Sequence, residues 1–318
     1  MKLPTQLFID VSRCCNLRCV MCDIYSAKAD AAYSLNKAHV SELMDWALFA
    51  NIVDEAKEFI NIFVPQLRGE PLMHPRFADM VEYIREKAPQ SHIWFNTNGL
   101  LLDRKLTDRL LGARVNGIGI SLDAVTRDVY DQIRIGSDFE RVVDNVRYLA
   151  KASRRGWRRA KTEVSVSFVL QDANRHEKKA FLKYWLPRLD RVQFYAKLEM
   201  DRRRPTLFTG AKGARGPCKS LWNSLAVHSD GIVVPCSGDL TPLEALGDAK
   251  TTPLREIAEG NRLQRLRNLH VEGRQQDIPL CAGCDSWLAY QQRTYGFSKK
   301  FFVTRSPLAE IWEGKGKK

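Results

Sequence analysis

The sequence lacks any run of about 18 consecutive apolar residues, which is the length that a membrane-spanning helix requires. Its first residues, MKLPTQLFID, also lack the apolar core of a signal peptide. Both absences predict a cytoplasmic protein that makes no membrane contact. Because disulfide bonds are rare in the reducing cytoplasm, we expect the 8 cysteines to be metal ligands rather than disulfide partners.

Acidic residues are also in short supply, since 37 aspartates and glutamates face 50 lysines and arginines and leave a net charge of +13. Many of the basic residues lie in the segments 151–161 and 201–205. A groove for single-stranded nucleic acid interleaves basic residues with aromatic ones, and only Trp157 interrupts the first segment. We therefore rank RNA below two alternatives: a solvated surface, and a small anionic substrate or peptide that binds near the second segment.

Short runs rich in apolar and β-branched residues predict strands along the first two thirds of the chain. They cover residues 7–12, 60–66, 92–96, 117–123, 163–170 and 191–196. Helical periodicity occurs between them, around 40–58, 76–88, 103–113 and 139–152. This alternation predicts parallel strands with right-handed crossovers, in an open sheet or a barrel, with functional residues at the carboxyl ends of the strands.

The pattern changes after about residue 200. Residues 209–217 are glycine-rich and predict a linker, and residues 224–236 predict a β-hairpin. Two short helical segments follow, and then a last helix is predicted over about 285–295. The predicted organisation is a first domain over 1–204, a small α+β domain over 205–296 and a C-terminal tail over 297–318.

Four of the cysteines lie within CCNLRCVMC, directly after the first predicted strand. Cys15, Cys19 and Cys22 have the spacing C-x3-C-x2-C. Three thiolates on a [4Fe–4S] cluster leave one iron open to a further ligand, whereas four-cysteine zinc sites generally pair C-x2-C knuckles. The spacing favours an iron–sulfur cluster, with zinc and chance as the alternatives.

This spacing, with Met21 before the last cysteine and a six-fold strand and helix alternation around it, resembles the radical S-adenosylmethionine (radical SAM) superfamily over about residues 5–200. The resemblance implies a partial (β/α)6 TIM-like barrel and a cluster that binds S-adenosylmethionine (SAM). Residues 68–71, RGEP, resemble the Gly-Gly-Glu-Pro segment of the family. They imply that Gly69 and Glu70 join Met21 in binding SAM, with Glu70 at its amino group.

Two further segments, NTNG and SLDA, match family positions after the third and fourth strands. The residues that would contact SAM there are Asn98, Ser121 and Asp123. Two departures weaken the match: Arg68 stands where the family has its first glycine, and residues 168–174 lack the glycines often seen at the fifth strand. These departures leave the assignment of the cluster intact.

The remaining cysteines are Cys218, Cys236, Cys281 and Cys284. Their spacing resembles the auxiliary-cluster extension called SPASM or, in its shortened form, twitch. Four protein thiolates complete the coordination of one [4Fe–4S] cluster, and a site so closed suits electron transfer better than substrate binding. A zinc ion is the alternative occupant. The gaps between these cysteines are similar to those of twitch dehydrogenases that act on aminocyclitols.

The remaining candidates for catalysis are Cys14 and polar residues at or after the sixth strand. We expect Cys14 to be either a packed residue that binds no metal or a hydrogen-atom donor of the kind that an epimerase needs. Tyr195, Arg202, Arg203 and Arg204 lie near the predicted barrel mouth, where one of them could bind substrate or remove a proton. The alternative for the arginines is a solvated surface.

The resemblance implies that SAM is cleaved to a 5′-deoxyadenosyl radical that abstracts a substrate hydrogen. We expect an oxidoreductase that oxidises a carbinol of a small polar, aminocyclitol or sugar-like intermediate of natural-product biosynthesis, with the auxiliary cluster as electron acceptor. A reducing partner such as flavodoxin or ferredoxin would supply the first electron.

Three other functions stay open. One is epimerisation of a sugar or peptide residue, and another is peptide modification. Peptide-modifying members of the family often carry an N-terminal leader-binding domain, which we do not expect here because only about six residues precede the first predicted strand; peptides stay possible substrates. The third belongs to another class, a non-enzymatic iron–sulfur electron carrier. An electron carrier needs cluster ligands but has no use for the GEP, NTNG and SLDA segments.

Overall fold

The computed structural model describes residues 2–26, 43–154, 162–197, 215–296 and 301–314. The chain falls into two compact units, each assembled from segments far apart in the sequence. The first unit combines residues 1–15, 35–95 and 214–287, and the second combines residues 16–34, 96–213 and 288–318.

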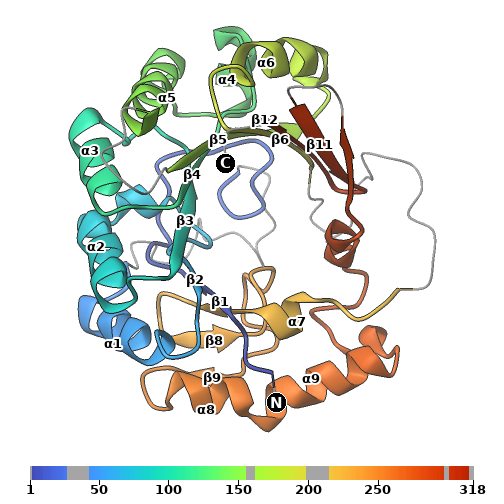
Figure 1. The fold of residues 1–318 in the computed structure, drawn as a ribbon. Coiled ribbons are helices and arrows are strands. Elements are labelled where there is room, and N and C mark those ends of the chain that lie inside the picture. The colour runs from blue at the N-terminus through green and yellow to red at the C-terminus, as the bar shows by residue number, and fades with distance from the viewer. Residues whose placement is uncertain (1, 27–42, 155–161, 198–214, 297–300, 315–318) are drawn as a thin grey trace. The chain divides into compact units, whose positions relative to one another are not determined.

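The first unit is built on a sheet in the strand order β3-β2-β1-β7-β8-β9. The strands are β1 (Gln6–Ile9), β2 (Ile62–Val64), β3 (His92–Thr97), β7 (Ser224–Val227), β8 (Ile232–Val234) and β9 (Gly247–Asp248), with β3 continuing into the second unit. The central strand β1 pairs in parallel with both β2 and β7 (Figure 1). The predicted hairpin over 224–236 is therefore confirmed, since β7 and β8 are antiparallel, and it also extends the sheet of the N-terminal strands.

Helices of the first unit pack on this sheet. They are α1 (Trp46–Ala56), α2 (Phe77–Lys87), α7 (Ser220–Asn223), α8 (Leu254–Glu259) and α9 (Asn261–Val271). Asp45 begins α1, because its carboxylate accepts hydrogen bonds from the N–H groups of Ala47 and Leu48. The amide of Leu254, at the start of α8, donates to the carboxylate of Glu55 in α1. This bond joins α8, which belongs to the segment that carries the four late cysteines, to α1 in the first half of the chain.

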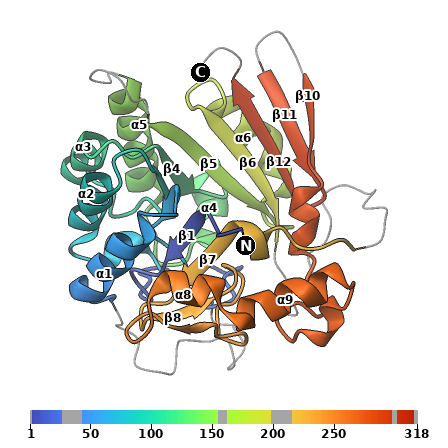
Figure 2. The ribbon, with the colours of Figure 1, turned by 60° about the horizontal axis from the view of Figure 1, so that its bottom comes forward.

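The second unit is built on the strand order β4-β5-β6-β12-β11-β10. The strands are β4 (Gly117–Ser121), β5 (Glu163–Leu170), β6 (Arg191–Ala196), β10 (Arg293–Gly296), β11 (Phe301–Ser306) and β12 (Ala309–Gly314). Strands β4, β5 and β6 are parallel, whereas β12 is antiparallel to β6 and β10 to β12 form a meander (Figure 2).

Helices cover one face of β4, β5 and β6 (Figure 1). They are α3 (Arg104–Gly112), α4 (Arg127–Ile133), α5 (Phe139–Arg154) and α6 (Lys178–Trp185). Phe168 of β5, Phe194 of β6 and Phe181 of α6 are fully buried, and Phe181 packs edge to face against both other rings. These contacts identify the helix-covered face of the strands as the apolar one.

All six predicted strands of the first 200 residues are confirmed, as are the predicted helices at α1, α2, α3 and α5. The sequence analysis missed α4 and α6. The helix predicted over 285–295 is wrong, because a short 3-10 turn (Ser286–Tyr290) leads there into strand β10. Residues 301–314, which the sequence analysis assigned to a C-terminal tail, form the strands β11 and β12. The domain boundaries predicted at residues 204 and 296 stay predictions. No helix in the described part of the chain is long and apolar enough to cross a membrane.

Candidate active site

The segment RGEP packs directly against the backbone that enters the first cysteine cluster. The amide of Gly69 donates to the carbonyl of Ser12 over 3.1 Å, and the amide of Glu70 donates to the carbonyl of Cys14 over 2.7 Å. A Cβ atom at position 69 would stand 2.3 Å from the Ser12 oxygen and 2.4 Å from the Cys14 oxygen. Only glycine allows this approach, so Gly69 fixes how the cysteine segment leaves β1.

Glu70 is 4% exposed, and its carboxylate accepts the amide of Leu72 over 3.1 Å. It thereby caps the 3-10 turn η1 (Pro71–Met73). The predicted contact between Glu70 and the amino group of SAM stays a proposal. The structure shows a carboxylate held in one orientation beside the cysteine segment.

Arg68, the departure from the family pattern, forms a buried ion pair. Its Nη2 lies 2.5 Å and its Nε 2.6 Å from Oδ2 of Asp10, a residue with no exposed surface. The guanidinium also donates to the Oγ of Ser229 over 3.4 Å and to the carbonyl of Leu240 over 3.3 Å. Arg68 therefore links the RGEP segment to the end of β1 and to the region around Cys236.

Cys19 and Cys22 of the first cluster motif each have an N–H donor at the sulfur. The Nη1 of Arg134 lies 3.7 Å from the Sγ of Cys19, and the amide of Tyr25 lies 3.3 Å from the Sγ of Cys22. Burial raises the pKa of the Cys19 thiol, while the Arg134 charge opposes that rise. N–H donors of this kind stabilise ligand thiolates, so both sulfurs suit an iron–sulfur cluster.

Asp123 holds the other side of Arg134. Its Oδ2 accepts the Nε of Arg134 over 2.8 Å, and its Oδ1 accepts the amide of Val169 over 2.6 Å. The residue is fully buried and has a left-handed φ of 65°. Asn174, which follows the fifth strand, donates to the carbonyls of both Asp123 and Val169. The observed role of Asp123 is to position Arg134, and its contact with SAM stays a prediction.

Asn98 contacts the cysteine segment from the end of β3. Its Nδ2 donates to Oδ1 of Asn16 over 2.7 Å, and its Oδ1 accepts the amide of Leu100 over 3.0 Å. Asn16 lies between the first two cysteines of the motif. Asn98 therefore orients the loop, and its predicted SAM contact stays a proposal.

The four late cysteines lie within the first unit, and two of them contact His270 of α9. The amide of Cys218 donates to Nδ1 of His270 over 3.1 Å, and Nε2 of His270 lies 3.3 Å from the Sγ of Cys281. Cys281 and Cys284 share one turn, in which the Cys284 amide donates to the Cys281 carbonyl over 3.0 Å. One histidine therefore contacts two of the proposed ligands.

The environment of two of these thiols disfavours the charged form. Burial, with a smaller contribution from Cys218, raises the pKa of Cys236 and of Cys281 to about 12. Free buried thiols would stay protonated at neutral pH. Bound iron reverses that preference, because metal ligation deprotonates a thiol outright. The four thiols therefore fit a cationic cluster site, although no three Cys, His, Asp or Glu among the described residues are grouped to hold a single metal ion.

The second unit presents a polar wall on the strand face turned away from its helices. The register places Ser121 of β4 beside Ser167 of β5 and Ser167 beside Gln193 of β6. These three are half-buried. One step toward the amino ends of the strands, Gly119 has no side chain and makes room for Oδ1 of Asn96, 2.2 Å from where a Cβ would stand. Hydroxyl and amide groups thus replace the apolar filling of an ordinary barrel interior.

Tyr195 lies on the same face as the polar wall and donates to Oε1 of Gln193. Burial raises the pKa of Tyr195 to about 12, so it is a poor base at neutral pH. Met21 and Cys14 are half-buried, and their roles stay predictions. The three arginines predicted near the barrel mouth, Arg202, Arg203 and Arg204, lie outside the described residues.

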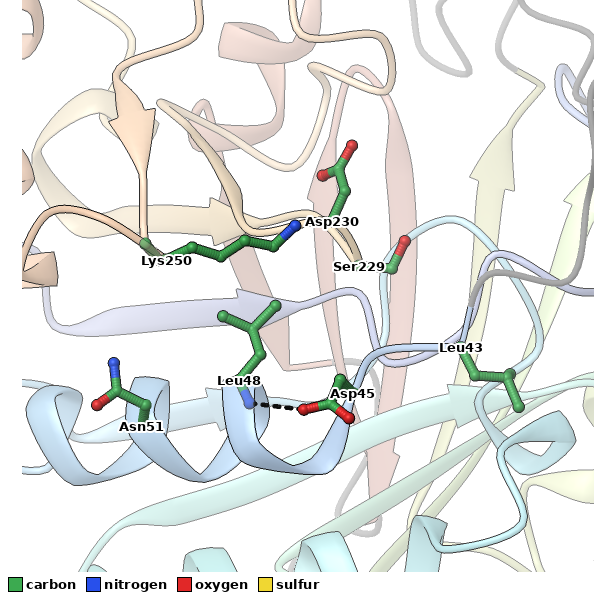
Figure 3. A pocket seen from close by; sticks show the side chains of 8 residues that line it. Leu43, Asp45, Leu48, Asn51, Ser229, Asp230 and Lys250 are labelled. Carbon is green, nitrogen blue, oxygen red and sulfur yellow. Dashed lines mark hydrogen bonds between the residues drawn. The ribbon is translucent and has the colours of Figure 1, made fainter.

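Sequence reasoning missed Arg134, His270 and Asn16. Asn16 lies inside the cysteine motif but is not a cysteine, and Arg134 and His270 belong to no motif; each is recognisable only by its position beside a cysteine or a predicted SAM-contact residue. A separate pocket of about 580 Å³ in the first unit contains none of the predicted site residues. Figure 3 shows Asp45 and Leu48 of α1 on one side, with Lys250 extending toward the turn at Ser229 and Asp230 on the other.

The comparison with protein families decides the class of this site. Residues 9–177, more than half of the chain, match the radical SAM superfamily. The chain belongs to the radical SAM superfamily. Residues 218–285 match the SPASM iron–sulfur cluster-binding domain. Together the two domains imply SAM and two [4Fe–4S] clusters, and the donor sets described above fit both clusters.

Curated relatives share only part of this radical SAM chain. A GTP 3',8-cyclase from Chlorobaculum tepidum is 33% identical over 137 residues, which are 42% of this chain and 37% of the cyclase. A mycofactocin maturase MftC from Mycobacterium ulcerans is 29% identical over 164 residues, which are 52% of this chain and 40% of the maturase. The chain thus spans less than half the length of either relative.

Solved radical SAM structures share the partial-barrel fold across most of the chain. BtrN in complex with AdoMet and 2-DOIA has a TM-score of 0.56 and 18% identity, over 89% of this chain and 94% of BtrN. The enzyme anSMEcpe with bound AdoMet has a TM-score of 0.63 and 19% identity, over 88% and 86%. SuiB from Streptococcus suis, bound to S-adenosylmethionine, has a TM-score of 0.64 and 14% identity, over 89% and 72%. These likenesses confirm the predicted barrel with its small C-terminal domain.

Proposed function

We propose that this radical SAM enzyme is a dehydrogenase that oxidises a carbinol of a small, hydroxyl-rich molecule, such as an aminocyclitol or a sugar derivative, in natural-product biosynthesis. When bound, SAM and its cluster supply a radical that removes one hydrogen atom from the carbinol carbon; loss of the hydroxyl proton to a base and of one electron to the auxiliary cluster leaves a ketone. The first electron would come from a flavodoxin or a ferredoxin.

The observation that carries this proposal is the closed set of late cysteines. Cys218, Cys236, Cys281 and Cys284 supply four thiolates, and a [4Fe–4S] cluster with four protein thiolates has no open iron for a substrate. Such a cluster is suited to accept an electron, which a dehydrogenation releases and an epimerisation does not.

The polar wall supports the substrate class. Ser121, Ser167 and Gln193 lie side by side across three strands, and Tyr195 donates to Gln193 one step further along β6. An apolar ligand would bury the Ser121 and Ser167 hydroxyl groups and the Gln193 amide nitrogen without supplying partners, which costs about 1–3 kcal/mol for each unsatisfied group. A substrate with several hydroxyl or amino groups satisfies them.

The residue that accepts the hydroxyl proton is a separate part of the proposal. Tyr195 is better suited to orient the substrate than to deprotonate it, since burial raises its pKa to about 12. Arg202 and Arg203 remain the proposed groups near the substrate, as the sequence predicts. Cys15, Cys19 and Cys22 are the proposed ligands of the first cluster, with Arg134 supporting Cys19.

The test uses anaerobically reconstituted protein with dithionite, SAM and a panel of aminocyclitols, sugar derivatives and peptides. The expected result is one 5′-deoxyadenosine for each ketone formed, with deuterium transferred from the carbinol carbon of a labelled substrate. A product with an inverted stereocentre, one solvent hydrogen and no change of oxidation state would refute the dehydrogenase and establish an epimerase. A modified peptide as the only product would establish a peptide-modifying enzyme instead.

Two variants separate the clusters in this assay. Replacing Cys15, Cys19 and Cys22 with alanine should lower the iron content from about eight to about four per chain and abolish SAM cleavage. Replacing Cys218 and Cys281 with alanine should leave SAM cleavage and remove ketone formation. If the second variant forms ketone at the wild-type rate, the auxiliary cluster is not the electron acceptor.

A further inference from the structure

His270 lies between two of the proposed auxiliary-cluster ligands, and its hydrogen bonds fix where its proton sits. Its Nδ1 is 3.1 Å from the backbone nitrogen of Cys218. A backbone amide can only donate, so Nδ1 is the acceptor and carries no hydrogen. The hydrogen of the neutral ring is therefore on Nε2, which lies 3.3 Å from the Sγ of Cys281. Nε2–H donates to the ligand sulfur.

His270 is buried on a helix that hydrogen bonds fix to its surroundings. His270 is 1% exposed, and its carbonyl accepts the side-chain amide of Gln275 over 3.1 Å. One turn earlier in α9, the Nε of Arg267 donates to the carbonyl of Leu221 over 2.9 Å and ties the helix to the segment after Cys218. Burial also lowers the pKa of His270 to about 4, in agreement with a neutral ring.

We propose that His270 is a positioning residue that raises the reduction potential of the auxiliary cluster through its Nε2–H···Sγ hydrogen bond to Cys281. A donor at a ligand sulfur withdraws electron density from the cluster and stabilises the reduced state, which carries one more negative charge. The donor is neutral, unlike the Arg134 guanidinium at Cys19 of the first motif. The chain thus equips its two clusters with different donors.

The inference rests on the proposed ligand set and deepens the proposed dehydrogenase. Oxidation of a carbinol sends one electron to the auxiliary cluster, while the hydrogen atom goes to the SAM-derived radical and the proton to a base. A cluster of higher potential accepts that electron more readily. His270 would therefore favour ketone formation over return of the hydrogen atom to the substrate.

Two substitutions each keep one of the two hydrogen bonds. In His270→Asn the side-chain oxygen replaces Nδ1 as acceptor for the Cys218 amide, and no donor reaches Cys281. In His270→Gln the side-chain NH₂ group replaces Nε2–H, and the acceptor for Cys218 is lost. The pair separates donation to the sulfur from support of the backbone.

The measurement is an EPR-monitored redox titration of the full chain carrying Cys15, Cys19 and Cys22 as alanine, so that only the auxiliary cluster contributes. We expect the midpoint potential to shift downward in the His270→Asn variant and to stay near the parent value in the His270→Gln variant. Equal potentials in all three proteins, or a downward shift in the His270→Gln variant, would overturn the proposal. If the His270→Asn variant fails to hold iron, His270→Leu, which also has no donor for Cys281, takes its place and should show the same downward shift; an unchanged potential there would overturn the proposal.

Iron and sulfide analysis distinguishes failure of the premise from failure of the inference. A parent protein without about four irons per chain would overturn the ligand set and the inference together. If the cluster is present and its reduction potential is the same in the parent and the His270 variants, only the inference is overturned. Neither result depends on the substrate, so the proposed dehydrogenase is judged separately by its product.

Discussion

The guanidinium of Arg134 is buried between the Asp123 carboxylate and the Cys19 thiol, with 2.8 Å from Nε to Oδ2 of Asp123 and 3.7 Å from Nη1 to Sγ of Cys19. Arg134 is 7% exposed and Asp123 has no exposed surface. Burial raises the pKa of the Cys19 thiol, and the Arg134 charge opposes this. Arg134 therefore offsets part of the cost of the thiolate that cluster assembly requires.

Replacing Arg134 with glutamine should destabilise the fold and weaken the first cluster. The variant leaves the Asp123 carboxylate buried without its cation, which lowers the free energy of unfolding by about 3–5 kcal/mol. The double variant Asp123→Asn with Arg134→Gln removes both charges and should recover most of that loss. Cys19 still lacks its cationic neighbour in the double variant, so we expect slower loading of the first cluster. Denaturation and the time course of iron incorporation measure the two effects.

The exposed pair Arg127 and Asp131 supplies the control, because its side chains are 65% and 49% exposed. Replacing Arg127 with glutamine should change the free energy of unfolding by no more than about 1 kcal/mol. A double variant that loads iron as fast as the wild type would show that Arg134 serves only the fold.

The buried pair Arg68 and Asp10 gives a second prediction. Arg68→Gly introduces the glycine that the family has at this position but leaves the buried Asp10 carboxylate without its cation. We therefore expect the free energy of unfolding to fall by about 3–5 kcal/mol. Arg68→Gly combined with Asp10→Asn should be more stable than Arg68→Gly alone. Chemical denaturation of anaerobic protein measures both. Equal stability of Arg68→Gly and the wild type would mean that the ion pair contributes nothing.

Arg68 also illustrates what the sequence could and could not predict. The motif identified residues 68–71 as a family segment, and the structure places that segment against the cysteine loop. The sequence analysis took Arg68 only as a weakened contact, because its partner Asp10 is 58 residues away and carries no motif. Pairings across such distances depend on the packed sheet and leave no periodicity to detect.

The same reason explains the errors in the C-terminal part. Strands β5 and β6 have the predicted bounds because their alternation of apolar and polar residues is local. Strand β12 is stabilised by pairing with β6, which places Ile311 opposite Gln193. No local signal marks this pairing, so the sequence analysis assigned the segment to a tail.

Gly69 provides the sharpest test of the contact between the RGEP segment and the cysteine loop. A Cβ there would stand 2.3 Å from the carbonyl oxygen of Ser12 and 2.4 Å from that of Cys14. Both are backbone atoms, which cannot move aside as the end of a flexible side chain can. We expect Gly69→Ala to displace the loop, lower the iron content from about eight to about four per chain and abolish SAM cleavage. The auxiliary cluster should stay.

Gly112, the last residue of α3, is the matched control, because a Cβ there meets no atom within 4 Å. Gly112→Ala should keep both clusters and gain up to about 1 kcal/mol of stability from its better helix propensity. If Gly69→Ala binds as much iron as Gly112→Ala, the close approach does not control the cysteine loop.

His228 should make stability depend on pH. It is fully buried at the end of β7, its Nε2 hydrogen-bonds to the Asp239 carbonyl over 2.9 Å, and burial lowers its pKa to about 4. The ordinary pKa of histidine is about 6.5. Between roughly pH 6.5 and 4, His228 is therefore protonated in the unfolded chain but neutral in the folded chain. Stability should therefore fall as the pH drops through this window, by up to about 1.4 kcal/mol per pH unit.

His228→Gln keeps a donor for the Asp239 carbonyl but cannot titrate, so its stability should vary less with pH across the same window. Thermal denaturation of anaerobic holoprotein at pH 4.5, 5.5 and 6.5 or so measures the slope. Replacing His92 with glutamine is the control, because this histidine lies at the surface. Parallel profiles for His228→Gln and the wild type would show that His228 accepts its proton in the folded state.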